Sequence, residues 1–431
     1  MDADVIVVGG GIAGLTAARD LRAAGRRAIV LEARDRLGGR AWTGVLPDTD
    51  VRVEWGATWV HPETQPNVAA AIAEFGLRTD LPTAHPTLIW RSGDRLRSGN
   101  EAAAAWRQAA RRFEPALANV AERLRNATES GSLADLADLD VPVTAWLEAF
   151  DGSNDAGEAL LAVTAAMGGG DPAHLSILPV LIDMFETGYG IEHVWDHIGV
   201  TFSDGTSALV DALGTGLEVR LDHAVARVRT TTDRVEIELR SGTVLSSEVA
   251  VIALPLNVWR DVGFDPQLSD AKARAAATGH PGHVTKVLAL VRGVPAEVRA
   301  MGWNTPITAL VAMPSTGDDG RLTVGFARGG VLDPTDAEAV RAAIRAFLPE
   351  SEVVVSHGHD WAADPFARGT WGALPPGWLT DGTFDALERA EGGRLCFAGG
   401  DIAPDGAGWI EGALASGHRA AATLDRMLES T

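Results

Sequence analysis

Apolar residues recur along the chain in two periods, and these periods predict alternating strands and helices. A short β-branched run, Asp4 to Gly10, is followed by an Ala/Leu-rich helical stretch, Ile12 to Ala24, and by a second apolar run, Ala28 to Leu31. A strand, a helix and a strand in so short a span predict a βαβ unit. Apolar and polar residues then alternate over 218–254, which predicts several short strands. The pattern therefore favours an α/β protein.

The middle of the chain, residues 67–200, has mostly helical periodicity. Residues Glu101 to Asn126 predict one long helix with Asn100 as its N-cap, and Asp171-Pro172 predicts the start of another. We expect the first and last strands to meet in one sheet, so that the domains are discontinuous in sequence. The later predicted elements are strands at 284–291, 322–326 and 395–399 and helices at 337–347 and 408–427.

Composition places the chain among globular proteins and excludes several partners. It has 431 residues, of which 46% are hydrophobic and 22% charged, and this predicts two or three domains. Lys and Arg total 37 against 58 for Asp and Glu, a net charge of −21 that argues against nucleic acid or anionic membranes as partners. The single cysteine, Cys396, excludes an internal disulfide and multi-cysteine metal sites.

The expected location is cytoplasmic. No apolar run approaches the roughly 18 residues that a membrane helix needs, and the acidic start, Met1 to Asp4, has no basic region typical of a secretory signal. We therefore expect neither a membrane nor a nucleic acid as a partner.

A glycine motif, Gly9-x-Gly11-x-x-Gly14, lies between the first predicted strand and helix. Gly9 permits a tight turn, Gly11 lets the backbone approach a pyrophosphate, and Gly14 lets helix and strand pack closely. Glu32 ends the next strand, where a carboxylate binds ribose hydroxyls. The helix N-terminus offers free N–H groups to phosphate. These features together predict a dinucleotide site.

A second glycine-rich stretch, Arg36-Leu37-Gly38-Gly39-Arg40, follows. It fits a second backbone approach to the same pyrophosphate, with Arg40 as a bidentate cation, although a simple surface loop is the alternative. With the first motif it resembles the flavin-dependent amine oxidase superfamily, which includes monoamine, polyamine and nicotine oxidases. The resemblance implies FAD and a monoamine oxidase-like fold, in which a Rossmann-like FAD domain joins a substrate domain of mixed sheet and helices.

Further segments along the chain are similar to this family, among them Glu54 to Val60, Val251 to Pro255 and Gly408 to Ala413. The resemblance implies an FAD domain formed by 1–79, 203–279 and 390–431, and a substrate domain formed by 80–202 and 280–389. The cofactor-binding residues that it implies are Gly9, Gly11, Gly14, Glu32, Arg34, Gly39, Arg40, Gly56, Ala57, Thr58, Val225, Trp361, Gly400, Asp401 and Ile410.

The resemblance also implies catalytic roles for three residues. Lys286, one of two lysines in the chain, matches a lysine that hydrogen-bonds through a water to flavin N5; the alternative is a strand-edge lysine on a wet face. Trp371 and Trp409 match two aromatic residues that flank the amine, and core packing is the alternative for each. Thr370 stands where monoamine oxidases carry the cysteine bonded to flavin, so we expect noncovalent FAD.

The expected reaction is oxidation of a C–N bond to an imine or iminium by hydride transfer to flavin N5, with O2 as the electron acceptor. Segments such as Thr58 to His61 and Gly369-Thr370-Trp371 look closest to the bacterial nicotine and pseudooxynicotine oxidase branch, which implies a secondary or heterocyclic amine that could belong to secondary metabolism. A homodimer is one option for the oligomeric state. Other flavin oxidases, such as an L-amino-acid oxidase or a desaturase, a cytochrome-linked dehydrogenase and a silent flavin-binding scaffold stay open.

A few residues are left without an assigned role. His61, Glu63 and Tyr189 are candidate polar groups of the pocket, and Arg328 is the candidate cation that an amino-acid oxidase would need for its carboxylate. The motif 357–360, with two histidines and an aspartate, imitates a metal site, but no third ligand is spaced to support it, so no metal is expected.

Overall fold

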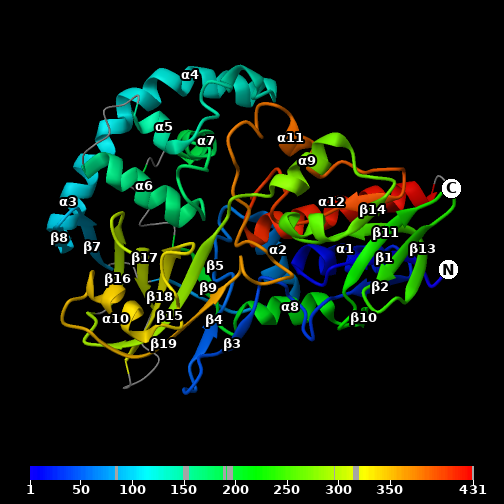
Figure 1. The fold of residues 1–431 in the computed structure, drawn as a ribbon, viewed down its shortest axis with the longest axis horizontal. Helices are drawn as coiled ribbons and strands as arrows, with labels where there is room; N and C mark the ends of the chain where they lie inside the picture. The colour runs from blue at the N-terminus through cyan, green and yellow to red at the C-terminus, as the bar shows by residue number, and fades with distance from the viewer. Residues whose placement is uncertain are drawn as a thin grey trace.

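Two large β-sheets organise the computed structural model (Figure 1). It describes residues 1–82, 86–148, 155–187, 191, 198–295, 297–313 and 320–429. The strands of the first sheet come from 3–31, 218–265 and 395–397, and those of the second come from 87–98 and 284–360. The division into two domains itself stays a prediction.

The first sheet contains both ends of the chain. In it β1 (Ala3–Val8) lies between β2 (Ala28–Leu31) and β13 (Val244–Ile252), and β20 (Leu395–Phe397) also pairs with β13; all three pairings are parallel. The prediction that the first and last strands share a sheet is therefore confirmed. The remaining strands are β10 (Glu218–Arg220) beside β2, and β12 (Val235–Leu239), β11 (Val225–Thr230) and β14 (Gly263–Asp265) beyond β13.

Helices from opposite ends of the sequence cover one face of this sheet. The first helix, α1 (Ile12–Ala23), lies alongside the last, α12 (Ile410–Glu429), as Figure 1 shows. Gly417 of α12 permits this approach, because a Cβ there would lie 2.5 Å from the carbonyl oxygen of Ala13. Two more helices, α2 (Pro66–Phe75) and α8 (Thr206–Gly214), complete the layer.

The second sheet is mostly antiparallel, with one parallel pair, β16 with β7. Its order is β19 (Glu352–Asp360), β15 (Val284–Arg292), β18 (Arg321–Arg328), β17 (Ile307–Ala312), β16 (Val298–Gly302), β7 (Thr87–Ser92) and β8 (Arg95–Ser98). Figure 1 shows α10 (Ala337–Arg345) on one side of it and an arch of helices on the other. Both faces are thus covered, and β15 is buried along almost its whole length.

The arch is built from 99–187. Its helices are α3 (Gly99–Ala110), η1 (Arg111–Phe113), α4 (Glu114–Ser130), η2 (Ala134–Leu136), α5 (Val143–Glu148), α6 (Asp155–Met167) and α7 (Leu178–Thr187). The smaller elements of the fold are β3 (Thr43–Val45), β4 (Arg52–Glu54), β5 (Trp59–Val60), β6 (Thr79–Asp80), β9 (Val200–Phe202), η4 (Leu256–Asp261), α9 (Asp270–Thr278) and α11 (Thr383–Leu387). No helix among the described residues is both long and apolar enough to cross a bilayer.

Residues 67–200 are mostly helical, as predicted, but part of this span forms strands and three specific expectations within it are wrong. Residues 79–98 form the strands β6, β7 and β8 rather than helix. The expected long helix is divided between α3 and α4 because Pro115, in the first turn of α4, cannot continue a helix from the preceding turn, and Ser98 rather than Asn100 is at the N-cap position. Asp171-Pro172 forms a turn in which Asp171 accepts a hydrogen bond from Ala173 N, and the next helix begins only at Leu178.

The packing of α1 on β1 generates a test of the glycine motif. Gly14→Ala should lower the free energy of unfolding of the apoprotein by roughly 1–3 kcal/mol, because its methyl group would lie 2.0 Å from Gly9 O. Helix propensity alone would favour alanine by about 1 kcal/mol, so a loss of stability in Gly14→Ala would have to come from the close contact with Gly9 O. Gly11→Ala is the control, since its methyl group would meet only Gly38 O, at 4.0 Å. Urea unfolding that leaves the two variants equally stable would contradict this packing.

Candidate active site

A cavity of about 590 Å³ lies where the two sheets approach each other. Its lining includes residues that follow β1 and β2 in the first sheet and residues of β15, β16, β17 and β18 in the second. Every residue expected in the cofactor and catalytic sites lines it except Gly14, which packs α1 against β1 instead. These residues are Gly9, Gly11, Glu32, Arg34, Gly39, Arg40, Gly56, Ala57, Thr58, Val225, Lys286, Trp361, Trp371, Gly400, Asp401, Trp409 and Ile410.

The glycine loop forms one end of the cavity. Gly9 has a φ of 112°, and a Cβ there would lie 2.5 Å from Ala253 O, so only glycine fits the turn. Glu32 accepts hydrogen bonds from Gly10 N (2.7 Å) and Arg34 N (2.9 Å), which hold the loop against the end of β2. The N-terminus of α1 and the open side of Gly11 therefore face the cavity, as a bound pyrophosphate requires.

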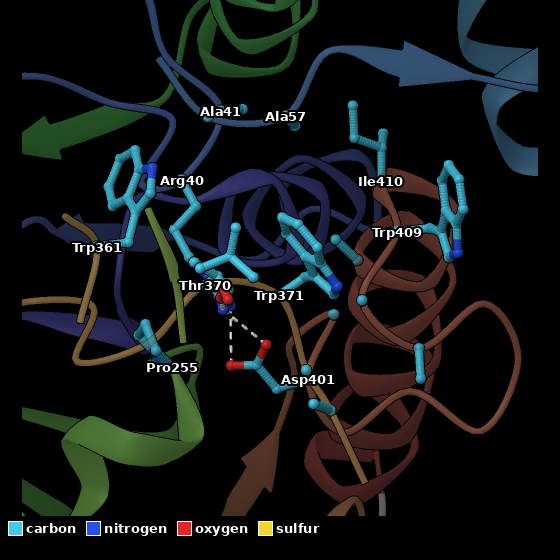
Figure 2. A pocket seen from close by; sticks show the side chains of 18 of the residues that line it. Arg40, Ala41, Ala57, Pro255, Trp361, Thr370, Trp371, Asp401, Trp409 and Ile410 are labelled. Carbon is cyan, nitrogen blue, oxygen red and sulfur yellow. Dashed lines mark hydrogen bonds and ion pairs between the residues drawn. The ribbon is translucent and has the colours of Figure 1, made fainter. Parts of the chain in front are cut away.

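Arg40 binds protein groups rather than projecting freely. Its Nη2 donates to Asp401 Oδ2 (2.8 Å), and its Nη1 donates to Thr370 O; Figure 2 shows the guanidinium directed at Asp401. Burial acts to raise the pKa of Asp401, but the charge of Arg40 and smaller contributions from His280 and from the hydrogen bonds of Arg40 and Leu256 N together hold the pKa below its usual range. Bidentate binding of pyrophosphate by Arg40 stays a prediction for the loaded protein.

Lys286 reaches the cavity from the middle of the second sheet. It lies on β15 opposite Phe326 of β18, so both side chains are on the same face. Its Nζ donates to Gly56 O (2.7 Å) and to Thr58 Oγ1 (2.5 Å). Among the described residues, no carboxylate lies within ion-pair distance of this nitrogen, and burial lowers the pKa of Lys286 to about 7, opposed by the charge of Glu54.

Glu54 is itself buried and hydrogen-bonded. Its carboxylate accepts from Thr206 N (2.9 Å), Thr206 Oγ1 (2.7 Å) and Thr43 Oγ1 (3.0 Å). Burial raises the pKa of Glu54, and the Thr206 hydrogen bonds oppose that rise. Glu54 therefore acts on Lys286 through its field, without a direct bond.

Aromatic side chains form the wall on the side of the second sheet. Trp371 donates from Nε1 to Met167 O (3.0 Å) and meets Phe326 edge to face, with ring centroids 5.9 Å apart. Phe326 also packs on Trp59, at 5.9 Å. Trp409 directly precedes α12 (Figure 2), and its ring lies 5.3 Å from that of His61. Trp371 and Trp409 thus line the same cavity, held by different neighbours.

Trp361 and a set of apolar side chains form the rest of the cavity lining. Trp361 is buried and donates from Nε1 to Trp55 O (3.1 Å), which fixes its ring beside Gly56. Beyond the aromatic wall, the lining is mostly aliphatic and thioether; its residues are Val163, Ala166, Met167, Leu175, Val180, Met184, Ile191, Met301, Leu310 and Val311. Arg299 and Asp183 are charged members of this part of the lining.

Sequence reasoning did not single out Trp59, Phe326, Met301 or Arg299 as cavity residues. Trp59 lies within a segment matched to the family, and Phe326 ends a predicted strand, but nothing in the pattern indicates which face they occupy. β16, which carries Arg299 and Met301, reads Val-Arg-Ala-Met-Gly and has too little apolar alternation to be predicted at all.

The unassigned candidates lie in different places. Arg328 does not line the cavity; it lines a second cavity and lies over the Trp303 ring, at 4.5 Å, so it is wrong as the carboxylate-binding cation of the first cavity. His61 contacts Trp409 from outside the lining, and Glu63 is exposed. Tyr189 falls outside the described residues. In the part of the chain that the structure describes, no group of three or more His, Cys, Asp or Glu could hold a metal, and 357–360 belong to β19.

A nucleotide-binding loop and an aromatic compartment on one cavity are typical of flavin-dependent oxidoreductases. Comparison with known proteins gives the family: residues 12–425 match the model of flavin-containing amine oxidoreductases, and the chain belongs to that family. The chain is 33% identical to an (S)-6-hydroxynicotine oxidase of Paenarthrobacter nicotinovorans, over 95% of this chain and 96% of that one. It is 32% identical to a pseudooxynicotine dehydrogenase of a Pseudomonas species, over 97% and 85%.

A solved structure shows the same fold. Cyclohexylamine oxidase from Brevibacterium oxydans superimposes with a TM-score of 0.81, at 21% identity and with 100% of both chains covered. The resemblance to the nicotine and pseudooxynicotine branch and the monoamine oxidase-like fold are therefore confirmed. The enzyme is an FAD-dependent amine oxidoreductase, and the open face of Gly11 and the buried Glu32 carboxylate at the cavity fit that cofactor.

The lowered pKa of Lys286 generates a test on the apoprotein. An unfolded lysine titrates near 10.4, so between about pH 7 and about pH 10 the unfolded chain binds the extra proton and stability rises with pH. Lys286→Met removes this dependence of the free energy of unfolding on pH. The stability advantage of methionine should therefore be largest near pH 7 and decrease by at most about 1.4 kcal/mol per pH unit above it. Urea unfolding of both proteins at several pH values measures this difference in stability. A difference that is independent of pH would show that the pKa of Lys286 in the folded protein is that of an unperturbed lysine.

Proposed function

We propose that the enzyme oxidises a C–N bond of a secondary or heterocyclic amine to an imine or iminium, with O2 as the electron acceptor. The observation that carries the proposal is that a single cavity joins the nucleotide loop at Gly9–Gly11 to the compartment walled by Trp59, Trp371 and Phe326. A cofactor lying along the loop and an amine in the compartment would then share one water-poor space.

FAD, when bound, supplies the acceptor for the hydride, with its two electrons, that leaves the carbon next to the amine nitrogen. Gly11, Glu32 and the N-terminus of α1 would hold its nucleotide part, with Val225 beside the adenine. We propose noncovalent binding. Thr370, at the position of the attached cysteine in monoamine oxidases, carries no thiol, and Cys396 lies in β20, buried and off the cavity lining, where burial raises the pKa of its thiol to about 12.

The cavity favours a neutral amine. Of the described residues that line it, three carry carboxylates, and Glu32 and Asp401 are bonded to backbone N–H groups and to Arg40. The third, Asp183, lies on an exposed part of α7. An ammonium entering the aromatic compartment would lose hydration without a buried countercharge, so the neutral form binds better. The neutral form also has the lone pair that the oxidation requires.

Lys286 supplies a second basic nitrogen without a fixed charge. With its pKa lowered to about 7, its Nζ holds or releases a proton near neutral pH while Gly56 and Thr58 keep it in place. A group of this kind suits proton transfer during reoxidation by O2. One relative is named an oxidase and another a dehydrogenase, so the electron acceptor could be O2 or another oxidant. We propose O2, as in the oxidase, which is 33% identical to this chain.

An anaerobic titration tests the proposed function. Nicotine-like secondary and heterocyclic amines should bleach the flavin absorbance of the FAD-loaded enzyme, whereas amino acids should not, because their carboxylate would lose its hydration in the aromatic compartment. Simple diamines should be poor substrates, because the buried carboxylates of the lining, Glu32 and Asp401, are already bonded to protein groups and leave the distal ammonium without a partner. Bleaching by amino acids but by no amine would overturn the proposal.

Trp371→Ala should slow flavin reduction by a saturating amine about tenfold or more, because the wall facing the amine and its contact with Phe326 are lost. FAD should stay bound, and Trp371→Phe should restore most of the rate, since a ring still fills the position. Stopped-flow reduction compares the three proteins. Equal rates for Trp371→Ala and the parent enzyme would remove Trp371 from the site.

Lys286→Met should slow reoxidation of the reduced enzyme by O2, about tenfold or more, because the proton donor at Nζ is removed. The matched control is Lys272→Met, which removes the other lysine; that side chain is buried away from the cavity and bonded to Arg389 O and Glu391. Mixing photoreduced enzyme with O2-saturated buffer measures both rates. An unaltered rate in Lys286→Met would reject this role.

A further inference from the structure

A second cavity, of about 370 Å³, lies on the other side of the wall that carries Thr370. It is bounded by η4, by the segment leading into β15, by the end of β18 and by the loop that ends at Arg368. Its volume is within the range of small-molecule sites. The basic side chains on its lining are Arg260, Arg328, Arg368, His174, His280 and His283.

The charge of this second cavity is opposite to that of the molecule. Three arginines line it against one carboxylate, Asp171, in a chain whose net charge is −21. Arg368 is paired with Asp261, but among the described residues Arg260 and Arg328 form no ion pair. Elsewhere the half-buried arginines at the first cavity are paired, Arg34 with Asp364 and Arg40 with Asp401. The second cavity therefore has two arginines whose charge no described carboxylate pairs with.

The side chain of Arg328 is held in a fixed orientation. The guanidinium of Arg328 lies 4.5 Å from the centre of the Trp303 ring, and its Nε has no hydrogen-bond partner among the described residues. Stacking on a ring leaves the edge of a guanidinium free to donate to an oxyanion.

A buried histidine lies between the two cavities, with its Nε2 directed toward Asp401 of the first cavity. His280 is 5% exposed, and its Nδ1 accepts a hydrogen bond from Gly282 N (3.1 Å), so the proton of the neutral ring lies on Nε2. Nε2 has no hydrogen-bond partner, since Asp401 Oδ2 is 3.8 Å away. The Nε2 of His283 is likewise unsatisfied, 3.6 Å from Asp360. Buried polar atoms without partners are rare in native proteins and call for a ligand or water.

We propose that this second cavity binds a small oxyanion bearing two or more carboxylate or phosphate groups, held mainly by Arg260 and Arg328. The site is distinct from the proposed amine compartment, because none of these arginines lines the first cavity. It is nevertheless close to it: His280 lines the second cavity and faces Asp401, which lines the first. The ligand would therefore bind outside the proposed amine compartment.

Isothermal titration calorimetry of the FAD-loaded enzyme tests the site, because bound FAD excludes the probes from its own pyrophosphate position. Citrate and inorganic pyrophosphate are titrated separately at low ionic strength, where screening is weak. We expect saturable binding of at least one probe, and which probe binds distinguishes a carboxylate from a phosphate ligand. The negative net charge of the protein disfavours non-specific anion binding.

Variants assign the binding to this cavity. Arg328→Met and Arg260→Met should each weaken binding about tenfold or more, while Arg292→Met, an exposed arginine at the end of β15 outside both cavities, should leave it unchanged. The proposal is overturned if the parent enzyme binds neither probe, a result that needs no variant. It is also overturned if both cavity variants bind as tightly as the parent.

Discussion

Burial of the Lys286 amine without a carboxylate partner is the constraint on which the chemistry of this site depends. The strand that carries it is covered on both faces, and its nitrogen is held by a carbonyl and a hydroxyl rather than by an opposite charge. A cation is costly in such a place, so the proton of Lys286 is weakly held. The same shortage of buried countercharge applies to an entering amine. The lack of a buried countercharge thus favours the neutral form of both the Lys286 side chain and the proposed amine substrate.

A second interaction assembles the cavity from distant parts of the chain. Arg40 follows the N-terminal βαβ unit, Asp401 precedes the last helix, and Thr370 belongs to the loop after β19; the guanidinium of Arg40 joins all three. Leu256 N, from the segment after β13, donates to the same carboxylate (3.3 Å). Breaking a buried pair of this kind leaves an uncompensated charge, which is strongly destabilising. The ion pair therefore links the nucleotide end of the cavity to its aromatic wall.

The sequence predicts the nucleotide end of the site well because the determinants there are local. A turn with φ of 112° at Gly9 and a close helix–strand contact at Gly14 each require glycine, and the spacing to Glu32 follows from one helix and one strand. The part of the site formed by the second sheet is predicted less well from the sequence. β16 and β17 are buried on both faces and show no alternation, and Pro115 divides a helix whose composition is uniform. Phe326 lies beside Lys286 only through strand register, which no local pattern reveals.

The second cavity was equally hidden from the sequence. Arg328 was considered as a substrate-binding cation, but the register of β18 places it at the end of the strand, away from the first cavity. Its basic companions come from segments separated by up to about two hundred residues, and the structure alone brings them together. The sequence identified Arg328 as a candidate anion-binding residue, whereas the tertiary structure shows which cavity it lines.

The pH dependence of amine binding tests the central claim most directly. Dissociation constants for two reactive amines that differ in their own pKa would be taken from anaerobic stopped-flow reduction across the pH range. If the cavity takes up only the neutral amine, each affinity rises about tenfold per pH unit until the pH passes the pKa of that amine, so the two inflections lie at different pH values. Affinities independent of pH, or inflections that coincide for both amines, would show that the cavity accepts the ammonium form and would contradict the account.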